Sequence, residues 1–265
     1  MKICDLGEIQ GDMLLFGGVY SNLAALNALI RVAQDSGIPA KNCICTGDVV
    51  AYCADAQACV DTIRDFNCPV LVGNCEAQLA MNAQDCGCGF DKGTTCSVLS
   101  RDWYDHAVKQ VSAANKTWMA GLAERIVFTR NGELYGVVHG AASDISRFIW
   151  PVADDAVIAA EIETLIGQVG HVDHVLAGHT GIPMQRKVDG ITWVNSGAIG
   201  MPCHNGKTTT HYGYLSENEM TIKTLSYDVG QTVRAMQTAG LTQGYHETLQ
   251  TGYWPSQDNL PQEMH

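Results

Sequence analysis

Four polar residues in this sequence each follow a short, mostly apolar run that reaches a glycine or a further polar group. They are Asp48, Asn74, His139 and His179, and the runs before them span residues 43–45, 68–72, 134–138 and 174–177. Such runs are typical of buried strands in open α/β sheets, whose ligand sites lie just beyond the carboxyl ends of the strands. A carboxylate, an amide oxygen and two imidazoles suit a divalent transition metal. The pattern therefore predicts a metal site at one sheet edge.

Cys75 and Glu76 come directly after Asn74 and place further reactive groups beside the expected metal. A thiol close to a cation ionises below its free pKa of about 8.5 and can then serve as a ligand or a nucleophile. A plain packing role for Cys75 is an equal alternative. We expect Cys75 or Glu76 to act as an acid, a base or a positioning group.

Eleven cysteines are many for a chain of 265 residues, and the number is odd. In a reducing compartment they should be mostly thiols that pack, bind metal or react. Cys86, Cys88 and Cys96 lie in or beside a glycine-rich stretch, where they either form a small zinc site with Cys75, lend a thiolate to a metal, or belong to a buried or redox-sensitive loop. The C-x-C spacing departs from the usual C-x₂₋₄-C of structural zinc.

The composition excludes several classes of function. Acidic residues outnumber basic residues 28 to 16, the net charge is −12, and no block of Lys or Arg occurs. Long nucleic acid is therefore not an expected partner. Met1–Asp12 lacks the apolar core of a signal peptide, and no run approaches the ~18 apolar residues that cross a bilayer. We expect a cytoplasmic protein without a membrane partner, built as one domain over residues 1–265 with its core at about 13–225 and a C-terminal helix and tail at 226–265.

The elements that position these residues alternate in the first third of the chain. Strands are expected over residues 12–16, up to Asp48 and up to Asn74, and helices from Ser21 or Asn22 to about Ser36 and over residues 55–65. This order indicates right-handed βαβ units on a parallel sheet.

The remaining two thirds indicate antiparallel strands. Helices are expected at 101–114 and 154–166, and hairpins at 127–138, 183–194 and 211–225. Two sheets packed face to face with outer helices follow from this pattern. Residues 82–94 read as a long loop, and 245–265 as a tail that either covers a neighbouring surface or is disordered.

The order of these motifs resembles the calcineurin-like metallophosphoesterases, especially their small bacterial phosphodiesterase branch, over roughly residues 13–225. That family reads D-x-H-G-N-L, G-D, G-N-H-[DE], H-G, G-H-T-H and N-x-G-S. The matching segments here are 18–23, 47–48, 73–76, 139–140, 178–181 and 195–198. The resemblance implies an α/β fold, a four-layer αββα sandwich of two mixed sheets flanked by helices.

The departures from the family pattern fall on one metal position. The family's first metal is held by the Asp and His of D-x-H and by the last His of G-H-T-H, and here these positions are Gly18, Tyr20 and Gly181. The ligands of the other metal remain as Asp48, Asn74, His139 and His179. The resemblance thus implies one retained metal position and one that is lost or rebuilt. The phenol of Tyr20 either points at the site or packs.

The expected function is that of a metal-dependent hydrolase, a phosphatase or phosphodiesterase, acting on a small phosphorylated substrate. One divalent ion of Mn, Fe or Zn is expected rather than two, bound by Asp48, Asn74, His139 and His179, with Cys75, Glu76 and His139 as candidate catalytic groups. Two alternatives remain: a protein that kept the fold and binds a metal or ligand without catalysis, and a metalloenzyme whose site is rebuilt with thiolates. A homo-oligomer is possible on either reading. His204 and Asn205 occupy the stretch where related enzymes place a substrate-facing loop, and an ordinary surface loop is the alternative.

Overall fold

Two mixed β-sheets face each other in the computed structural model, which describes residues 1–89, 93–217 and 219–265. The six-stranded sheet has the order β1 (Ile3–Glu8), β4 (Arg125–Arg130), β5 (Glu133–Val137), β6 (His174–Ala177), β8 (Ile191–Asn195) and β7 (Met184–Val188). The four-stranded sheet has the order β10 (Glu219–Leu225), β9 (Thr210–Ser216), β2 (Met13–Phe16) and β3 (Cys43–Cys45).

Side chains that alternate along the strands fill the two faces of each sheet. On β2, Leu15 packs into the cluster between the sheets, whereas Leu14 and Phe16 face the helices. On β6, Leu176 lies between the sheets, whereas Val175 and Ala177 face the outer helix of the other side. Both sheets are therefore buried on both faces near their centres.

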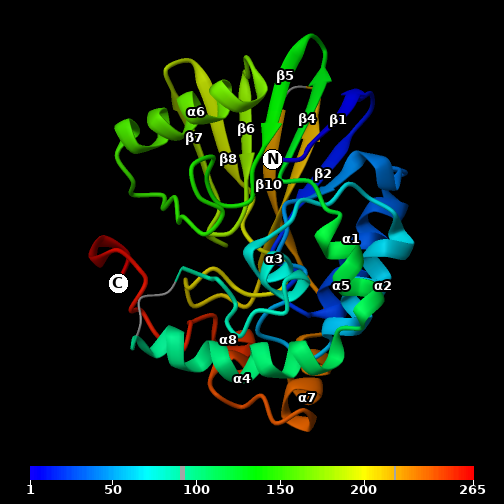
Figure 1. Cartoon of the computed structure of the whole chain (residues 1–265), viewed down its shortest axis with the longest axis vertical. Coiled ribbons are helices and arrows are strands. Elements are labelled where there is room, and N and C mark those ends of the chain that lie inside the picture. The colour runs from blue at the N-terminus through cyan, green and yellow to red at the C-terminus, as the bar shows by residue number, and fades with distance from the viewer. Residues whose placement is uncertain (90–92, 218) are drawn as a thin grey trace.

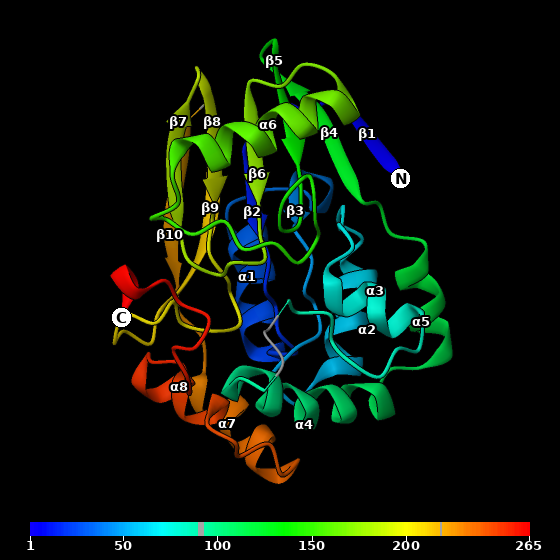
Figure 2. The same ribbon diagram turned by 60° about the vertical axis from the view of Figure 1, so that its left-hand side comes forward.

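Helices cover the outer face of each sheet (Figure 1). α6 (Asp155–Val169) packs on the six-stranded sheet, and α1 (Leu23–Asp35) and α2 (Ala56–Phe66) pack on the four-stranded sheet. This arrangement confirms the expected αββα sandwich. The remaining helices are α3 (Asn74–Ala80), α4 (Thr95–Gln110), α5 (Ala113–Ala120), α7 (Val229–Thr238) and α8 (Tyr245–Thr251). α4, α7 and α8 lie together below the sheets in both views (Figure 2).

Most expected elements occur close to their predicted bounds. Asn22 caps α1, its side-chain oxygen accepting from the backbone N–H of Ala25 at 3.1 Å. The three hairpins form as β4/β5, β7/β8 and β9/β10, although Asn218 in the turn of the last lies outside the described residues. The helix expected at 101–114 is instead the longer α4 followed by α5, because Ser112 caps a new helix.

Two strands differ from the expectation. β1 was not expected; it pairs in parallel with β4 at a sheet edge, where mostly exposed side chains give no burial pattern. The strand expected before Asn74 is reduced to isolated bridges of Val70 to Cys45 and of Leu71 to Ala123. This segment crosses from the four-stranded sheet toward the chain entering β4, so neither sheet holds it along its length. Phe90, Asp91 and Lys92 of the expected loop lie outside the described residues, and the described part of 82–94 is irregular.

No helix among the described residues is both long enough and apolar enough to cross a membrane.

Two glycines, one buried where α6 contacts the sheet and one exposed on α6, should respond oppositely to alanine. A Cβ on Gly136 of β5 would lie 2.9 Å from Leu165 Cδ2 and 3.1 Å from Val172 Cγ1. Gly136→Ala should therefore overpack this contact and lower the free energy of unfolding by about 1–3 kcal/mol. In α6, a Cβ on Gly167 would meet no atom of the described residues within 4 Å. Gly167→Ala should raise the free energy of unfolding by about 0.5–1 kcal/mol. Urea denaturation measures both, and equal signs would contradict the packing.

Candidate metal centre

The four predicted metal ligands come together at the ends of β3, β5 and β6 and at the start of α3. Asp48 follows β3 by three residues, His139 follows β5 by two and His179 follows β6 by two, whereas Asn74 is the first residue of α3. Asp48 and His179 have positive φ angles of 54° and 58°. Side chains other than glycine rarely adopt this conformation, and it is concentrated at functional sites.

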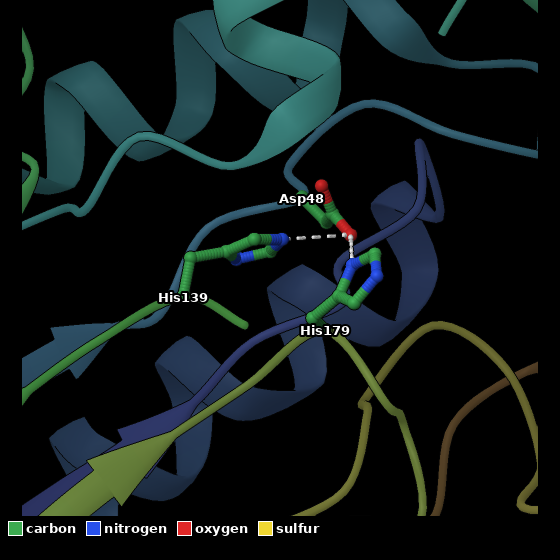
Figure 3. A group of neighbouring side chains, drawn as sticks. All are labelled: Asp48, His139 and His179. Carbon is green, nitrogen blue, oxygen red and sulfur yellow. Dashed lines mark ion pairs between the residues drawn. The ribbon is translucent and has the colours of Figure 1, made fainter. Parts of the chain in front are cut away.

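Donor atoms converge from three of these side chains (Figure 3). The carboxylate oxygen Oδ2 of Asp48 lies 3.4 Å from Nε2 of His139 and 3.8 Å from Nδ1 of His179. Ligand atoms of the three residues lie within 4.8 Å of one another, and all three side chains are buried. The fourth predicted ligand joins them, because Oδ1 of Asn74 lies 3.1 Å from Nε2 of His139. The structure thus brings together the complete predicted set.

Three of the four predicted ligands, the two histidines and the asparagine, are each oriented by a hydrogen bond from another polar atom of the side chain. Nδ1 of His139 bonds the carbonyl of Thr46 at 2.6 Å, and Nε2 of His179 bonds the carbonyl of Ser146 at 2.9 Å. Asn74 donates from Nδ2 to the carbonyl of Cys86 at 3.0 Å. These bonds leave one ring nitrogen of each histidine and the amide oxygen facing the centre. Bonds of this kind to backbone carbonyls typically fix metal-binding histidines.

The electrostatics of the cluster also fit a cation. Burial opposes the charge on Asp48, but the two imidazoles outweigh burial and hold the pKa of Asp48 well below its ordinary value. Burial would lower the pKa of His139, yet the Asp48 carboxylate and the Thr46 carbonyl raise it, whereas burial lowers the pKa of His179. Oδ1 of Asp48 and Nδ1 of His179 are buried without a hydrogen-bond partner among the described residues. Orphaned polar atoms of this kind call for a ligand, and a divalent cation would satisfy both.

Tyr20 fills the space between the two glycines that replace ligands of the family's first metal. A Cβ on Gly18 would lie 2.7 Å from Cζ of Tyr20, and a Cβ on Gly181 would lie 3.3 Å from its hydroxyl. The ring is 6% exposed, and burial raises the pKa of the phenol well above its ordinary value, followed by the charge of Asp48. Tyr20 is therefore a neutral, packed phenol at this position.

Glu76 holds the loop that carries Asp48. Its Oε2 accepts from the backbone N–H of Asp48 at 2.8 Å and of Gly73 at 3.0 Å, and its Oε1 accepts from that of Val50 at 3.0 Å. The side chain is fully buried, and burial followed by the charge of Asp48 raises the pKa of Glu76 to about 7. With both oxygens engaged by backbone donors, Glu76 is placed to position Asp48.

Of the four cysteines considered as metal ligands, Cys75, Cys86 and Cys88 lie close to the Asn74 side chain. Cys75 Sγ lies 3.9 Å from Cys88 Sγ, and Nδ2 of Asn74 contacts both sulfurs at 3.4 Å. Cys86 and Cys88 form a disulfide across the turn at Gly87, and the other nine cysteines are free. Without a bound cation, burial and then the charge of Asp48 raise the pKa of the Cys75 thiol well above its ordinary value. Cys96 instead lies in α4 and lines an adjacent pocket.

Sequence reasoning missed that aromatic pocket, which adjoins His179. Its lining includes Phe148, Trp150 and several residues of the C-terminal tail, which is ordered rather than loose. The only signals were single aromatic residues without periodicity. His204 accepts a hydrogen bond at Nδ1 from the backbone N–H of Trp254 and so braces the tail, while Asn205 is exposed and caps the backbone N–H of Lys207.

Replacing Glu76 should destabilise the site loop in a graded way. Glu76→Ala leaves three backbone N–H groups without an acceptor, and an unpaired buried donor costs about 1–3 kcal/mol. Glu76→Gln keeps one acceptor oxygen and should cost less. Denaturant unfolding of the two variants beside the parent protein measures the difference. Equal stability of Glu76→Ala and the parent would contradict the role assigned to Glu76.

The raised pKa of Glu76 should also appear as a pH dependence. The folded chain holds this proton up to a pH of about 7, whereas the unfolded chain loses it near the ordinary value of 4.5. The unfolded chain therefore binds fewer protons in this window, and the free energy of unfolding of the metal-free protein should fall as pH rises through it. Denaturation in EDTA at several pH values should show a shallower fall for Glu76→Gln, and identical slopes would count against a buried carboxyl with this pKa.

Comparison with known proteins identifies the family. The family model described as the calcineurin-like phosphoesterase superfamily domain matches residues 17–219. An uncharacterized protein of Methanocaldococcus jannaschii is 39% identical over 66 residues, which cover 25% of this chain and 26% of that protein. The match thus spans about a quarter of the length of this curated relative.

Two solved structures share the fold. The crystal structure of a metallophosphoesterase from Sphaerobacter thermophilus has a TM-score of 0.70 at 20% identity, covering 92% of this chain and all of that chain. The crystal structure of a hypothetical protein from Pyrococcus horikoshii OT3 has a TM-score of 0.73 at 13% identity, covering 92% and 98% of the two chains. Since the family match extends over most of a fold of this kind, the chain belongs to the calcineurin-like phosphoesterase superfamily.

Proposed function

We propose that this protein is a metal-dependent hydrolase of a small phosphate mono- or diester, with a single metal ion bound by Asp48, Asn74, His139 and His179. The observation that carries the proposal is the convergence of donor atoms from four side chains, among which Oδ1 of Asp48 and Nδ1 of His179 are buried without partners among the described residues. In the reaction, the oxygen of water forms a bond to phosphorus and the bond to the leaving oxygen breaks. The leaving alcohol takes a proton.

The ligand chemistry favours Mn, Fe or Zn as the ion, since imidazole with carboxylate and amide oxygens suits these metals. When bound, the cation would polarise a phosphoryl oxygen and lower the pKa of water in the site. The chain itself supplies the fixed orientation of its ligands. Few cationic side chains lie near the motifs, so attraction of an anionic phosphate depends on the ion and on backbone N–H groups.

The proposal of a single ion is supported by the residues at the position that corresponds to the family's first metal. Gly18 and Gly181 offer no ligand atom in their side chains, and the neutral phenol of Tyr20 fills the space between them. A phenol with a raised pKa is a poor metal ligand. The two glycines at ligand positions, together with the Tyr20 ring that packs against them, favour loss of the first metal over its reconstruction.

Cys75 is proposed as a positioning group rather than a nucleophile. Its Sγ accepts a hydrogen bond from Nδ2 of Asn74 at 3.4 Å, and in the metal-free chain burial raises the pKa of the thiol. A neutral thiol is a weak nucleophile. His139, whose Nε2 lies between Asp48 and Asn74, remains both the predicted metal ligand and a predicted catalytic group.

A second candidate function is ligand or metal binding without catalysis. The observation that favours this function is that Tyr20 packs at the first metal position. With that position filled, a lone ion lacks the bridging geometry of a metal pair. Absence of turnover on a broad panel of phosphoesters by the metal-loaded protein would select this candidate.

The single-domain organisation, the cytoplasmic location and a homo-oligomer remain predictions.

Removing one imidazole should abolish high-affinity metal binding and turnover. His179→Ala is expected to weaken Mn²⁺ or Zn²⁺ binding by at least about 100-fold, since even the partners that orient a ligand contribute 10–100-fold. Isothermal titration calorimetry and phosphate release measure both effects. His171→Ala, at an exposed histidine paired with Asp173, is the matched control and should change neither. Unaltered affinity in His179→Ala would refute the ligand set.

Cys75→Ser separates the positioning role from the thiolate-rebuilt site. If Cys75 positions Asn74, this variant should retain the metal identity and stoichiometry of the parent and lose about 2- to 10-fold in kcat, the scale of one neutral hydrogen bond. Elemental analysis and phosphate release provide the readouts. Cys4→Ser, at a half-buried free thiol near the start of β1, is the control. A changed metal identity would instead favour a site completed by thiolates.

A further inference from the structure

We infer that the aromatic pocket beside His179 binds the leaving group of the substrate, and that this group is a flat, uncharged ring carrying a hydrogen-bond acceptor. The inference rests on the proposed function and deepens it, because it names the substrate class and the segment of the chain that selects it. The pocket and the metal centre share His179, so a phosphoester bound at the ion would extend into the pocket.

The wall of the pocket continues directly from the metal ligand. The ring of Phe148 lies 4.3 Å from that of His179, centroid to centroid, and Trp150 stacks on Phe148 at 4.9 Å with an interplanar angle of 8°. His179 is held by the carbonyl of Ser146, two residues before Phe148. The same loop therefore orients the ligand and presents the rings.

Three tyrosines form a further aromatic part of the lining. Tyr20 contacts Tyr52 at 4.8 Å, and Tyr52 contacts Tyr245 of α8 at 4.5 Å. The enclosed cavity measures about 60 Å³ and opens to solvent at its mouth. Aromatic walls favour a flat ring, because stacked and edge-to-face contacts add to the burial of apolar area.

The C-terminal tail closes the pocket and is fixed in place. Trp254 donates from Nε1 to the carbonyl of Pro202 at 2.7 Å, and its backbone N–H bonds Nδ1 of His204 at 2.7 Å. Asp258 accepts from the backbone N–H of Thr95 at 2.7 Å, and Leu260 is buried. In Figure 2 the chain after α8 turns back toward the loops at the end of the sheets. The pocket is thus formed before a ligand arrives.

The polar groups of the pocket define what the ring carries. Within the described part of the chain, no Lys, Arg, Asp or Glu lines the pocket, so a charged leaving group would find no counter-ion there. Asn259 lines it as well, and its Nδ2 is buried with no hydrogen-bond partner among the residues described. An amide N–H of this kind is satisfied by an acceptor on the ligand.

The test compares matched substrates. The pair is 2-phenylethyl phosphate and 2-cyclohexylethyl phosphate, with their methyl diesters, because the leaving alcohols differ in ring flatness and little in basicity. We expect kcat/KM to favour the phenyl substrate about five- to tenfold, the scale of an aromatic contact beyond burial. Trp254→Leu should remove most of this preference, and Glu263→Ala, at an exposed residue of the same tail, should keep it. Equal rates for both rings in the parent protein would overturn the inference.

Asn259 has a test of its own. A 2-(4-pyridyl)ethyl substrate differs from the 2-phenylethyl substrate by one acceptor nitrogen in the ring. Asn259→Ala should lower kcat/KM for the pyridyl substrate and leave kcat/KM for the phenyl substrate unchanged. Equal effects on both substrates would refute recognition of an acceptor by Asn259.

A binding measurement separates this inference from the proposed hydrolysis. Tryptophan fluorescence of the metal-free protein in EDTA is titrated with 2-phenylethanol and 2-cyclohexylethanol, in the parent and in Trp254→Leu. Selective binding of the phenyl alcohol by the parent protein, and its loss in Trp254→Leu, would support the inference about the pocket. If no phosphoester is turned over at the same time, only the hydrolase proposal is contradicted. Turnover without ring selectivity in either assay would leave the hydrolase standing and overturn the pocket.

Discussion

The carboxylate of Asp48 is buried, and this one charge constrains the arrangement around it. An ionised carboxylate away from water is strongly unfavourable unless it is paired and hydrogen-bonded. The two imidazoles lie against one of its oxygens, Glu76 holds its backbone N–H, and its other oxygen has no partner among the described residues. Backbone carbonyls fix both imidazoles with one nitrogen turned inward. A cation at the centre gives all of these features a common cause.

The altered metal position and the aromatic pocket are connected through Tyr20. Its ring occupies the space left by Gly18 and Gly181, and through Tyr52 it joins the wall that reaches Tyr245. The side chain that stands at an implied ligand position therefore also contributes to the aromatic lining of the pocket, and residues of the tail after α8 extend this lining.

Local signals in the sequence were sufficient for most of the fold and for the convergence of the four predicted metal ligands. The apolar runs before Asp48, His139 and His179 are strand ends, and position after a strand predicts a shared edge. Local signals did not predict the segments whose place in the fold depends on contacts with residues far away in the sequence. β1 has a mostly exposed pattern and is held by pairing with β4, and the tail is held by single hydrogen bonds such as that from Trp254 to Pro202. The burial of Cys75 beside Asp48 is likewise a property of the fold that spacing along the chain does not encode.

The most direct test of the central claim is the metal content per chain, measured by elemental mass spectrometry on protein purified without added metal or an affinity tag. A single retained centre predicts a value near one. A value near two would contradict the loss of the first metal and direct attention to Cys75 and the Cys86–Cys88 turn. A value near zero, with no uptake of manganese, iron or zinc, would contradict the metal centre itself.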